Sequence, residues 1–407
     1  MADYRAVRFA SINLGLLLFF ALSPYPRWMV PNGTIQVTFF ITTLIAIAQG
    51  KYWPSPEKKW MFISKLVYIA YFTLPIIHQF NGGHFLYYLV FLEILFFDKE
   101  VYLDGYLILR KIIVIVCICA LFVWFLHLLG FHLPFYEYDP DFRHSQLDKY
   151  HIYGPCISLY RGQSFIGGGL ERICGVFAEP GHFGIYLGLL MAIEKFEFDL
   201  KDNLVMLLTG ILTFSTAFYG ILFLGIAYRL LTNVRKIRDI RNIVVVGLVL
   251  LPFIGINSTF YNSAIGRVIE KQDGEELSVS SIIDKRTTGK TQSTYLRFST
   301  SKQFLMGKGN VEKDEIQITN WRGYIFRFGV FGAIIALLLV LSITSNRSVL
   351  YQALLISIAL LIFSHRSYIM YHPGIYMMLF IANMLSGKWS DIKEETALYE
   401  NPCCGQL

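Results

Sequence analysis

Charged residues are scarce in this sequence of 407 residues. Asp, Glu, Lys and Arg make up 16% of it, whereas soluble globular proteins carry about 25%. Hydrophobic residues make up 55%, and the mean hydropathy is +0.49. This composition argues against a single-core soluble domain, against disorder, and against collagen, disulfide-scaffold or coiled-coil classes. A multispanning membrane protein remains.

Short metal and nucleotide motifs are also missing. The sequence has no CxxC pair, no HExxH pattern, no Walker loop and no dinucleotide fingerprint on a strand–helix unit. We therefore expect no metal or cofactor, and no nucleic acid as a partner. Only six cysteines occur, and Cys156 and Cys174 share one loop. Whether these two form a disulfide depends on the compartment and on a geometry that spacing does not give.

Apolar runs predict the membrane spans. A membrane helix needs roughly 17–25 mostly apolar residues. Runs of this kind lie near 9–23, 34–49, 61–80, 84–97, 107–130, 180–194, 241–257, 323–344, 349–364 and 371–386. The segment 203–232 is too long for one simple helix, so we divide it at Ser215 and Thr216 into two short spans. The sequence thus predicts an all-α integral membrane protein with about twelve transmembrane helices.

Basic residues orient these spans. With the N-terminus inside, alternation puts 19 of the 36 Lys and Arg residues on the cytoplasmic side, whereas the short outside loops hold only Arg27 and Arg366. This asymmetry satisfies the positive-inside rule. It would fail if 203–232 formed one span, because every later loop would change sides. The division of 203–232 and the orientation therefore support each other.

Two long outside segments interrupt the spans. The predicted organisation comprises N-terminal transmembrane helices in 1–130, a first large outside loop in 131–179, central transmembrane helices in 180–257, a second large outside loop in 258–321, C-terminal transmembrane helices in 322–386 and a cytoplasmic tail in 387–407. Short loops are enough to connect spans, so we look for function in the two long ones.

The first large loop ends in a group of polar residues. Arg172, Glu179 and His182 surround Pro180, which suits the first turn of a helix because its missing N–H is not needed there. Glu179 would then lie at the positive end of the helix dipole. The simpler interpretation is an interfacial salt bridge between Arg172 and Glu179, with His182 on the surface. Aromatic residues of the same loop form either an interfacial belt or a platform for stacking sugars.

The second large loop is rich in basic residues. It has 11 Lys and Arg residues, counting Arg322 and Arg327 at the membrane edge. Solvated charge is the usual explanation for such a loop. An outside loop of this kind beside a membrane also suits an anionic, lipid-linked ligand. Arginine is the better phosphate ligand, because its planar fork donates two parallel hydrogen bonds.

Together these features resemble the O-antigen polymerase and ligase superfamily. The resemblance covers roughly 165–385, and the motifs agree in order, spacing and sidedness. The residues that carry it are Arg172 to Gly184 with Gly175, Phe177, Glu179 and Pro180, the divided span around Ser215, Arg297 about ten residues before Gly307-Lys308-Gly309, Asn320, and Gly329-Val330-Phe331-Gly332.

The resemblance implies a GT-C-like membrane glycosyltransferase in the bacterial inner membrane, with its active site and both large loops facing the periplasm. The donor would be an oligosaccharide on undecaprenyl pyrophosphate, and the partners would be membrane lipid and a chain-length regulator. A polymerase extends a lipid-linked repeat unit, whereas a ligase transfers the chain to a lipopolysaccharide core. Ligases of this family usually carry a histidine in the second large loop. All nine histidines here lie outside 258–321, which favours a polymerase.

The resulting hypothesis gives roles to named residues. Arginines would stabilise the charge that develops on the pyrophosphate leaving group, with Arg172 and Arg297 as leading candidates. A carboxylate would accept the proton of the acceptor hydroxyl, with Glu179 as first choice and His182 in reserve. The candidates for substrate binding are Arg161, Arg286, Asn320, Tyr324, Arg366 and His372.

Two alternatives stay open, a ligase and a transporter or flippase for the same lipid-linked glycan. Transporters place intramembrane charges near the bilayer midplane. Glu93 is one of few charges near the interior of a predicted span. The polar candidates gather at the outside surface instead, which favours an enzyme.

Overall fold

The computed structural model describes residues 2–21, 24–49, 66–67, 89–90, 97, 99–131, 133–138, 150–154, 158–160, 172–198, 200–232, 289–309, 321–345, 348–366 and 373–386. Most of these residues are helical. The predicted spans at 61–80, 84–97 and 241–257 lie almost wholly outside the described residues.

Most of the described helices follow the predicted apolar runs. The described helices are α1 (Ala2–Ala21), α2 (Tyr25–Trp28), α3 (Asn32–Gln49), α6 (Lys99–Leu128), α7 (Pro180–Ile193), α8 (Lys201–Leu212), α9 (Thr216–Thr232), α14 (Gly289–Ser299), α15 (Gln303–Met306), α16 (Trp321–Ile343), α17 (Val349–His365) and α18 (Pro373–Leu385). Of these, α2, α14 and α15 lie between the predicted runs. The division of 203–232 into two helices is confirmed. Phe214, between α8 and α9, has a φ of 48°, a left-handed conformation that interrupts a helix.

Two helical segments, Glu100–Leu128 and Trp321–Ile343, are long and apolar enough to cross a membrane. Shorter apolar helices accompany them, at Val7–Ala21, Gly33–Ala48, Pro180–Ile193, Thr216–Thr232, Val349–His365 and Gly374–Leu385. The described helices are therefore consistent with a membrane protein.

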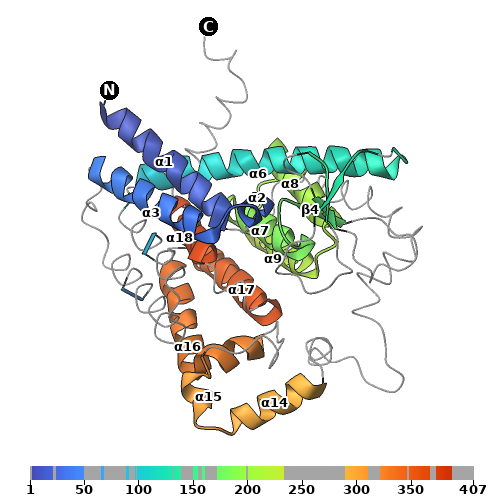
Figure 1. Ribbon diagram of the computed structural model, residues 1–407. Helices are drawn as coiled ribbons and strands as arrows, with labels where there is room; N and C mark the ends of the chain where they lie inside the picture. Colours follow the sequence, from blue (N-terminus) through green and yellow to red (C-terminus); the bar gives the residue numbers. More distant parts are fainter. Residues whose placement is uncertain are drawn as a thin grey trace.

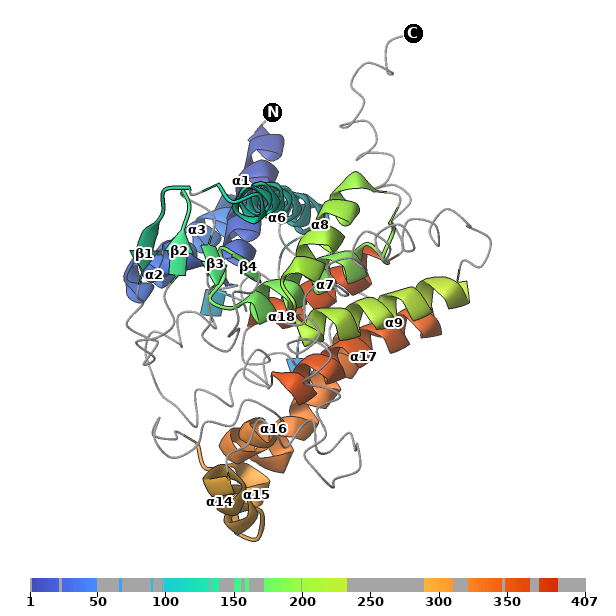
Figure 2. The same ribbon diagram turned by 90° about the vertical axis from the view of Figure 1, so that its right-hand side faces the viewer.

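Helix α7 lies at the centre of the bundle (Figures 1 and 2). All its residues except His182 are buried, and it packs against α8, α9, α17, α18 and strand β4. A Cβ atom at Gly184 would lie 2.9 Å from the Cβ of Ser215, and one at Gly188 would lie 2.8 Å from Cγ2 of Ile221. These two glycines, four residues apart, therefore let the backbones of α7 and α9 approach closely.

A small antiparallel sheet, which the sequence did not predict, lies in the first large loop. Its strands β1 (Tyr136–Tyr138), β2 (Tyr150–Ile152), β3 (Ser158–Tyr160) and β4 (Arg172–Gly175) pair in sequential order. Tyr150 is fully buried against Trp28, whose indole also stacks on Tyr138. These aromatic contacts tie α2 to the sheet. Because β4 leads directly into α7, the sheet fixes the chain just before Pro180.

The second large loop is joined to α16 at a break in that helix. Gly329 has a φ of 70° and a ψ of −177°, far from helical values. The carbonyls of Phe326 and Arg327 accept hydrogen bonds from the N–H groups of Lys308 and Gly309, at 2.8 and 3.0 Å. These bonds attach α14 and α15 to the start of α16, below the rest of the bundle in Figure 1.

Candidate functional site

Two polar clusters lie at opposite ends of α7. The Glu179 cluster comprises Arg172, Glu179, Thr216, His365 and Arg366. The Glu194 network comprises Tyr106, Arg110, Glu194, Asp202 and Asn203. Since α7 has 14 residues, its two ends are about 21 Å apart. The predicted alternation of spans puts the first cluster outside and the second inside, so each cluster joins residues assigned to one side.

Glu179 lies immediately before α7. Its backbone is extended, and Pro180 takes the first helical position, as the sequence predicts. The Glu179 carboxylate forms an ion pair with Arg366, which directly follows α17. Gly181 leaves room for this pair, because a Cβ atom there would lie 2.5 Å from Nη2 of Arg366. The Glu179 side chain is 33% exposed, so the carboxylate is both held in place and accessible.

Arg172, at the start of β4, holds the break between α8 and α9. Its Nε donates to the carbonyl of Thr213 at 2.9 Å, and its Nη2 donates to the carbonyl of Phe214 at 3.0 Å. Carbonyls at the C-terminal end of a helix lack intrahelical donors and carry the negative end of the dipole. The break lies beside the N-terminal half of α7, because Gly184 approaches Ser215 and Thr213. Arg172 therefore fixes a polar turn next to Glu179.

A histidine and a threonine complete the Glu179 cluster. Nε2 of His365 lies 3.0 Å from Oγ1 of Thr216, the first residue of α9. Because Arg366 pairs with Glu179, the end of α17 contacts both α7 and α9. No sequence pattern indicated the pairing of His365 with Thr216, since 149 residues separate them.

Three other predicted site residues, His182, Arg297 and Tyr324, form none of the side-chain contacts that define the Glu179 cluster. His182 is half-buried in the first turn of α7, and its backbone N–H donates to the backbone carbonyl of Glu179 at 3.0 Å. Arg297 is exposed on α14, which both views place apart from α7 and β4 (Figures 1 and 2). The structure therefore does not bring Arg297 to Arg172.

Tyr324 is a core residue. It is 1% exposed, and its ring packs against those of Phe328 and Phe363, each at a centroid distance of 5.0 Å. The remaining candidates, Arg161, Arg286, Asn320 and His372, lie outside the described residues, as do Glu93 and Cys156. Cys174 is buried in β4.

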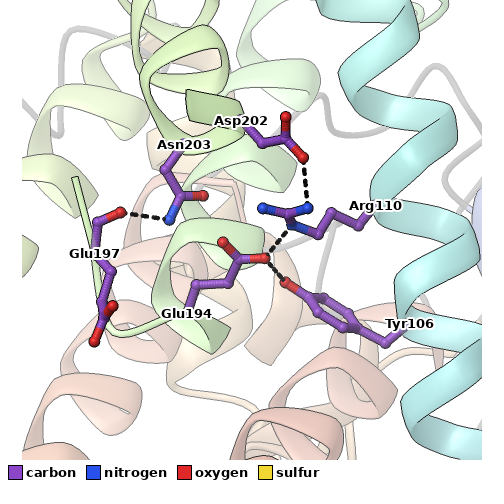
Figure 3. Close-up of polar contacts among 6 residues, drawn as sticks. All are labelled: Tyr106, Arg110, Glu194, Glu197, Asp202 and Asn203. Atoms are coloured by element: carbon purple, nitrogen blue, oxygen red, sulfur yellow. Dashed lines mark hydrogen bonds and ion pairs between the residues drawn. The ribbon is translucent and has the colours of Figure 1, made fainter. Parts of the chain in front are cut away.

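The Glu194 network joins α6, α7 and α8 (Figure 3). Oε1 of Glu194 accepts from the hydroxyl of Tyr106 at 2.6 Å and from Nε of Arg110 at 2.5 Å. Nη1 of Arg110 donates to Asp202 at 2.5 Å, and Nδ2 of Asn203 donates to the carbonyl of Glu197 at 2.8 Å. Glu194 and Asn203 are fully buried. From the sequence, Arg110 served only to orient the spans, and this network was not predicted.

Comparison with known proteins returned no relative. No protein-family model, no curated protein and no solved structure matches the chain. Across the described ranges, no group of three or more His, Cys, Asp or Glu side chains is arranged to hold a metal ion.

Proposed function

We propose that the protein is a membrane glycosyltransferase that polymerises a lipid-linked polysaccharide such as O-antigen or capsule. The observation that carries this proposal is the Glu179 cluster. An accessible carboxylate, two arginines and a histidine–threonine pair come from separate segments of the chain and meet at one end of the bundle. A general base and cationic groups at one partly exposed place are what transfer from a pyrophosphate-linked donor requires.

In the proposed reaction, Glu179 acts as the general base and basic groups stabilise the leaving group. The Glu179 carboxylate takes the proton of the acceptor hydroxyl while that oxygen bonds to the anomeric carbon of the donor sugar. The bond from this carbon to the pyrophosphate oxygen breaks, and the pyrophosphate leaves as an anion on its lipid. Arginines stabilise this anion most strongly once its charge has developed. The donor is already activated, so no nucleotide takes part.

Exposed apolar side chains support a place in the membrane. On α6, Ile115, Ile118, Phe122 and Phe125 form one outward face and are 50–64% exposed. Helices α1, α3 and α16 expose apolar faces of the same kind. Soluble monomeric proteins rarely expose contiguous apolar patches this extensive. We propose a multipass protein of the bacterial inner membrane with the Glu179 cluster on the periplasmic side.

One structural observation favours the alternative of a transporter or flippase. The Glu194 network buries charged side chains within the helix bundle, and intramembrane ionisable residues often mark transport pathways. Cells that lack the protein distinguish the two functions. Loss of a polymerase leaves single repeat units on the surface, whereas loss of a flippase removes the surface glycan altogether.

The direct test uses purified protein and a lipid-linked repeat unit. We expect a ladder of longer chains without nucleotide, without added metal and without a lipopolysaccharide core. A requirement for the core as acceptor would identify a ligase instead. Failure of the protein to lengthen any chain, with or without the core, would contradict glycosyl transfer.

The proposed orientation predicts the accessibility of two surface positions. Val30, which is 40% exposed, and Lys201, which is also exposed, are predicted to lie outside and inside respectively. In a variant whose six cysteines are replaced by serine, V30C should react with a membrane-impermeant thiol reagent on intact spheroplasts. K201C should react only after the membrane is opened. The reverse pattern would overturn the orientation.

Arg172 and Arg297 should respond differently to substitution. Arg172→Ala leaves the carbonyls of Thr213 and Phe214 without the donor that Arg172 provides. We therefore expect this variant to lose both long-chain polysaccharide and thermal stability. Arg172→Lys should restore little, because lysine lacks the planar fork. Arg297→Ala, at an exposed position, should shorten the polysaccharide with an unchanged melting temperature. Gel profiles of cell-surface polysaccharide and melting curves of the purified variants measure both effects. Full-length chains in R297A would show that Arg297 takes no part in the reaction.

A further inference from the structure

The Glu194 network contains three buried polar atoms whose hydrogen bonds are incomplete. Within the described part of the chain, Oε2 of Glu194, Oδ1 of Asn203 and Nη2 of Arg110 have no hydrogen-bond partner. In Figure 3 these atoms face the same space between Asn203 and Arg110. A buried polar atom without a partner costs free energy. Two of the three, Oε2 of Glu194 and Oδ1 of Asn203, are acceptors when Glu194 is ionised, so they cannot bond to each other.

The charges of the network are also unequal. With every group ionised, Glu194 and Asp202 contribute two negative charges against the one positive charge of Arg110. Nearby Lys195 does not bond to this group, because its Nζ donates to the carbonyl of Ser386 at 2.7 Å. An uncompensated charge in a protein interior is costly. With every group ionised, the network therefore lacks one positive charge.

We propose that Glu194 is a proton-binding site, with the proton on Oε2. A proton on this oxygen turns an acceptor into a donor toward Oδ1 of Asn203, which completes two of the three unpartnered atoms. It also brings the net charge of Glu194, Asp202 and Arg110 to zero. Oε1 keeps the bonds from Tyr106 and Arg110. Asp202, whose side chain is 27% exposed, is the charged member nearest to solvent.

A potassium or sodium ion fits this place less well than a proton. Such an ion would satisfy the two acceptors, but it would lie beside the guanidinium of Arg110 and be repelled by it. A water molecule could bond to all three atoms, but it would leave the net negative charge unchanged. The titratable and charged groups around Glu194 are Tyr106 and Arg110 of α6, Lys195 and Glu197 of the following turn, Asp202 of α8 and Tyr351 of α17, whose hydroxyl donates to Ala192.

Glu194→Gln provides the test, since an amide copies the shape and the donor of a protonated carboxyl. In purified protein, infrared spectra at neutral pH should show the C=O band of a protonated carboxyl in the wild type and should lack it in E194Q. The band should weaken in D202N, because that variant loses one of the two negative charges that share Arg110. The melting temperature of E194Q at acidic pH should stay within about 3 °C of that of the wild type. E194A should lose considerably more, because it leaves Nε of Arg110 and the hydroxyl of Tyr106 without their acceptor.

The pH dependence of stability gives a second readout. A carboxyl that is protonated in the folded protein and ionised in the unfolded chain makes the folded state bind more protons. Its stabilisation is complete below about pH 4.3, the value for an unperturbed glutamate, and is lost as the pH rises. The wild-type melting temperature should therefore fall with rising pH by an amount that E194Q does not show. Identical infrared bands in the wild type and E194Q, or an E194Q protein that does not fold when D202N does, would overturn the proposal.

Discussion

Glu179→Gln should abolish long-chain polysaccharide while the amount of protein in the membrane stays unchanged. Glutamine has the size of glutamate and still offers an oxygen to Arg366, so the contact between α7 and α17 persists. It cannot take a proton from an acceptor hydroxyl. Loss of a general base lowers the rate of transfer by about 10²–10⁴-fold. Gel profiles of cell-surface polysaccharide and immunoblots of membranes measure the two quantities.

The matched control for this substitution is Glu197→Gln. Glu197 is a half-buried glutamate three residues beyond Glu194, near the opposite end of α7. The same loss of a carboxylate there should leave the chain-length profile unchanged. Full-length chains in E179Q, or equal losses in both variants, would remove Glu179 from the reaction and reduce its ion pair with Arg366 to a structural contact.

Gly329→Ala should detach the second large loop from α16. The backbone of Gly329, with a φ of 70° and a ψ of −177°, is in a region that essentially only glycine occupies. A Cβ atom there would lie 2.5 Å from the backbone nitrogen of Gly307 and still closer to the carbonyl oxygen of Leu305. The conformational cost alone is about 1–3 kcal/mol, and the steric overlap with the backbone adds to it.

The expected result for G329A is faster proteolysis of α14 and α15 together with a lower melting temperature. Gly33→Ala is its control, since a Cβ atom at Gly33 would meet nothing within 4 Å and the residue lies in helix α3. That substitution should be neutral. If G329A resists protease as well as the wild type, the hydrogen bonds of Lys308 and Gly309 to α16 are not what holds the second loop.

Local features of the fold could be predicted from the sequence. Pro180 indicated the start of α7, and the charge asymmetry required a break near Ser215, which the structure contains. The sheet could not be predicted, because its strands have three or four residues each, too few for an alternating pattern to be recognised. The break at Gly329 also gave no signal, since a glycine inside an apolar run reads equally well as a packing residue.

The candidate site could be predicted only in part, because its contacts join distant segments. Glu179 and Arg366 were separate candidates in the sequence, whereas the structure pairs them across 187 residues. Arg172 was predicted to bind either Glu179 or substrate. In the structure it bonds two backbone carbonyls, which no sequence pattern encodes. The rule that orients spans counts charges without regard to burial. For that reason it treated Arg110 as a surface marker, although this side chain is buried.

The length of α7 has a consequence for how a lipid-linked substrate would reach the site. A helix of 14 residues extends about 21 Å, whereas the hydrocarbon layer of a typical bilayer is about 30 Å thick. The two polar ends of α7 therefore cannot both reach the headgroup level of an unperturbed bilayer. Either the surrounding lipid thins or Glu179 lies below the headgroups, recessed among the neighbouring helices. In the recessed case, the pyrophosphate group of a polyprenyl-linked substrate would have to enter the protein below the headgroup level before reacting. A site at this depth would exclude free sugar phosphates, which have no lipid tail.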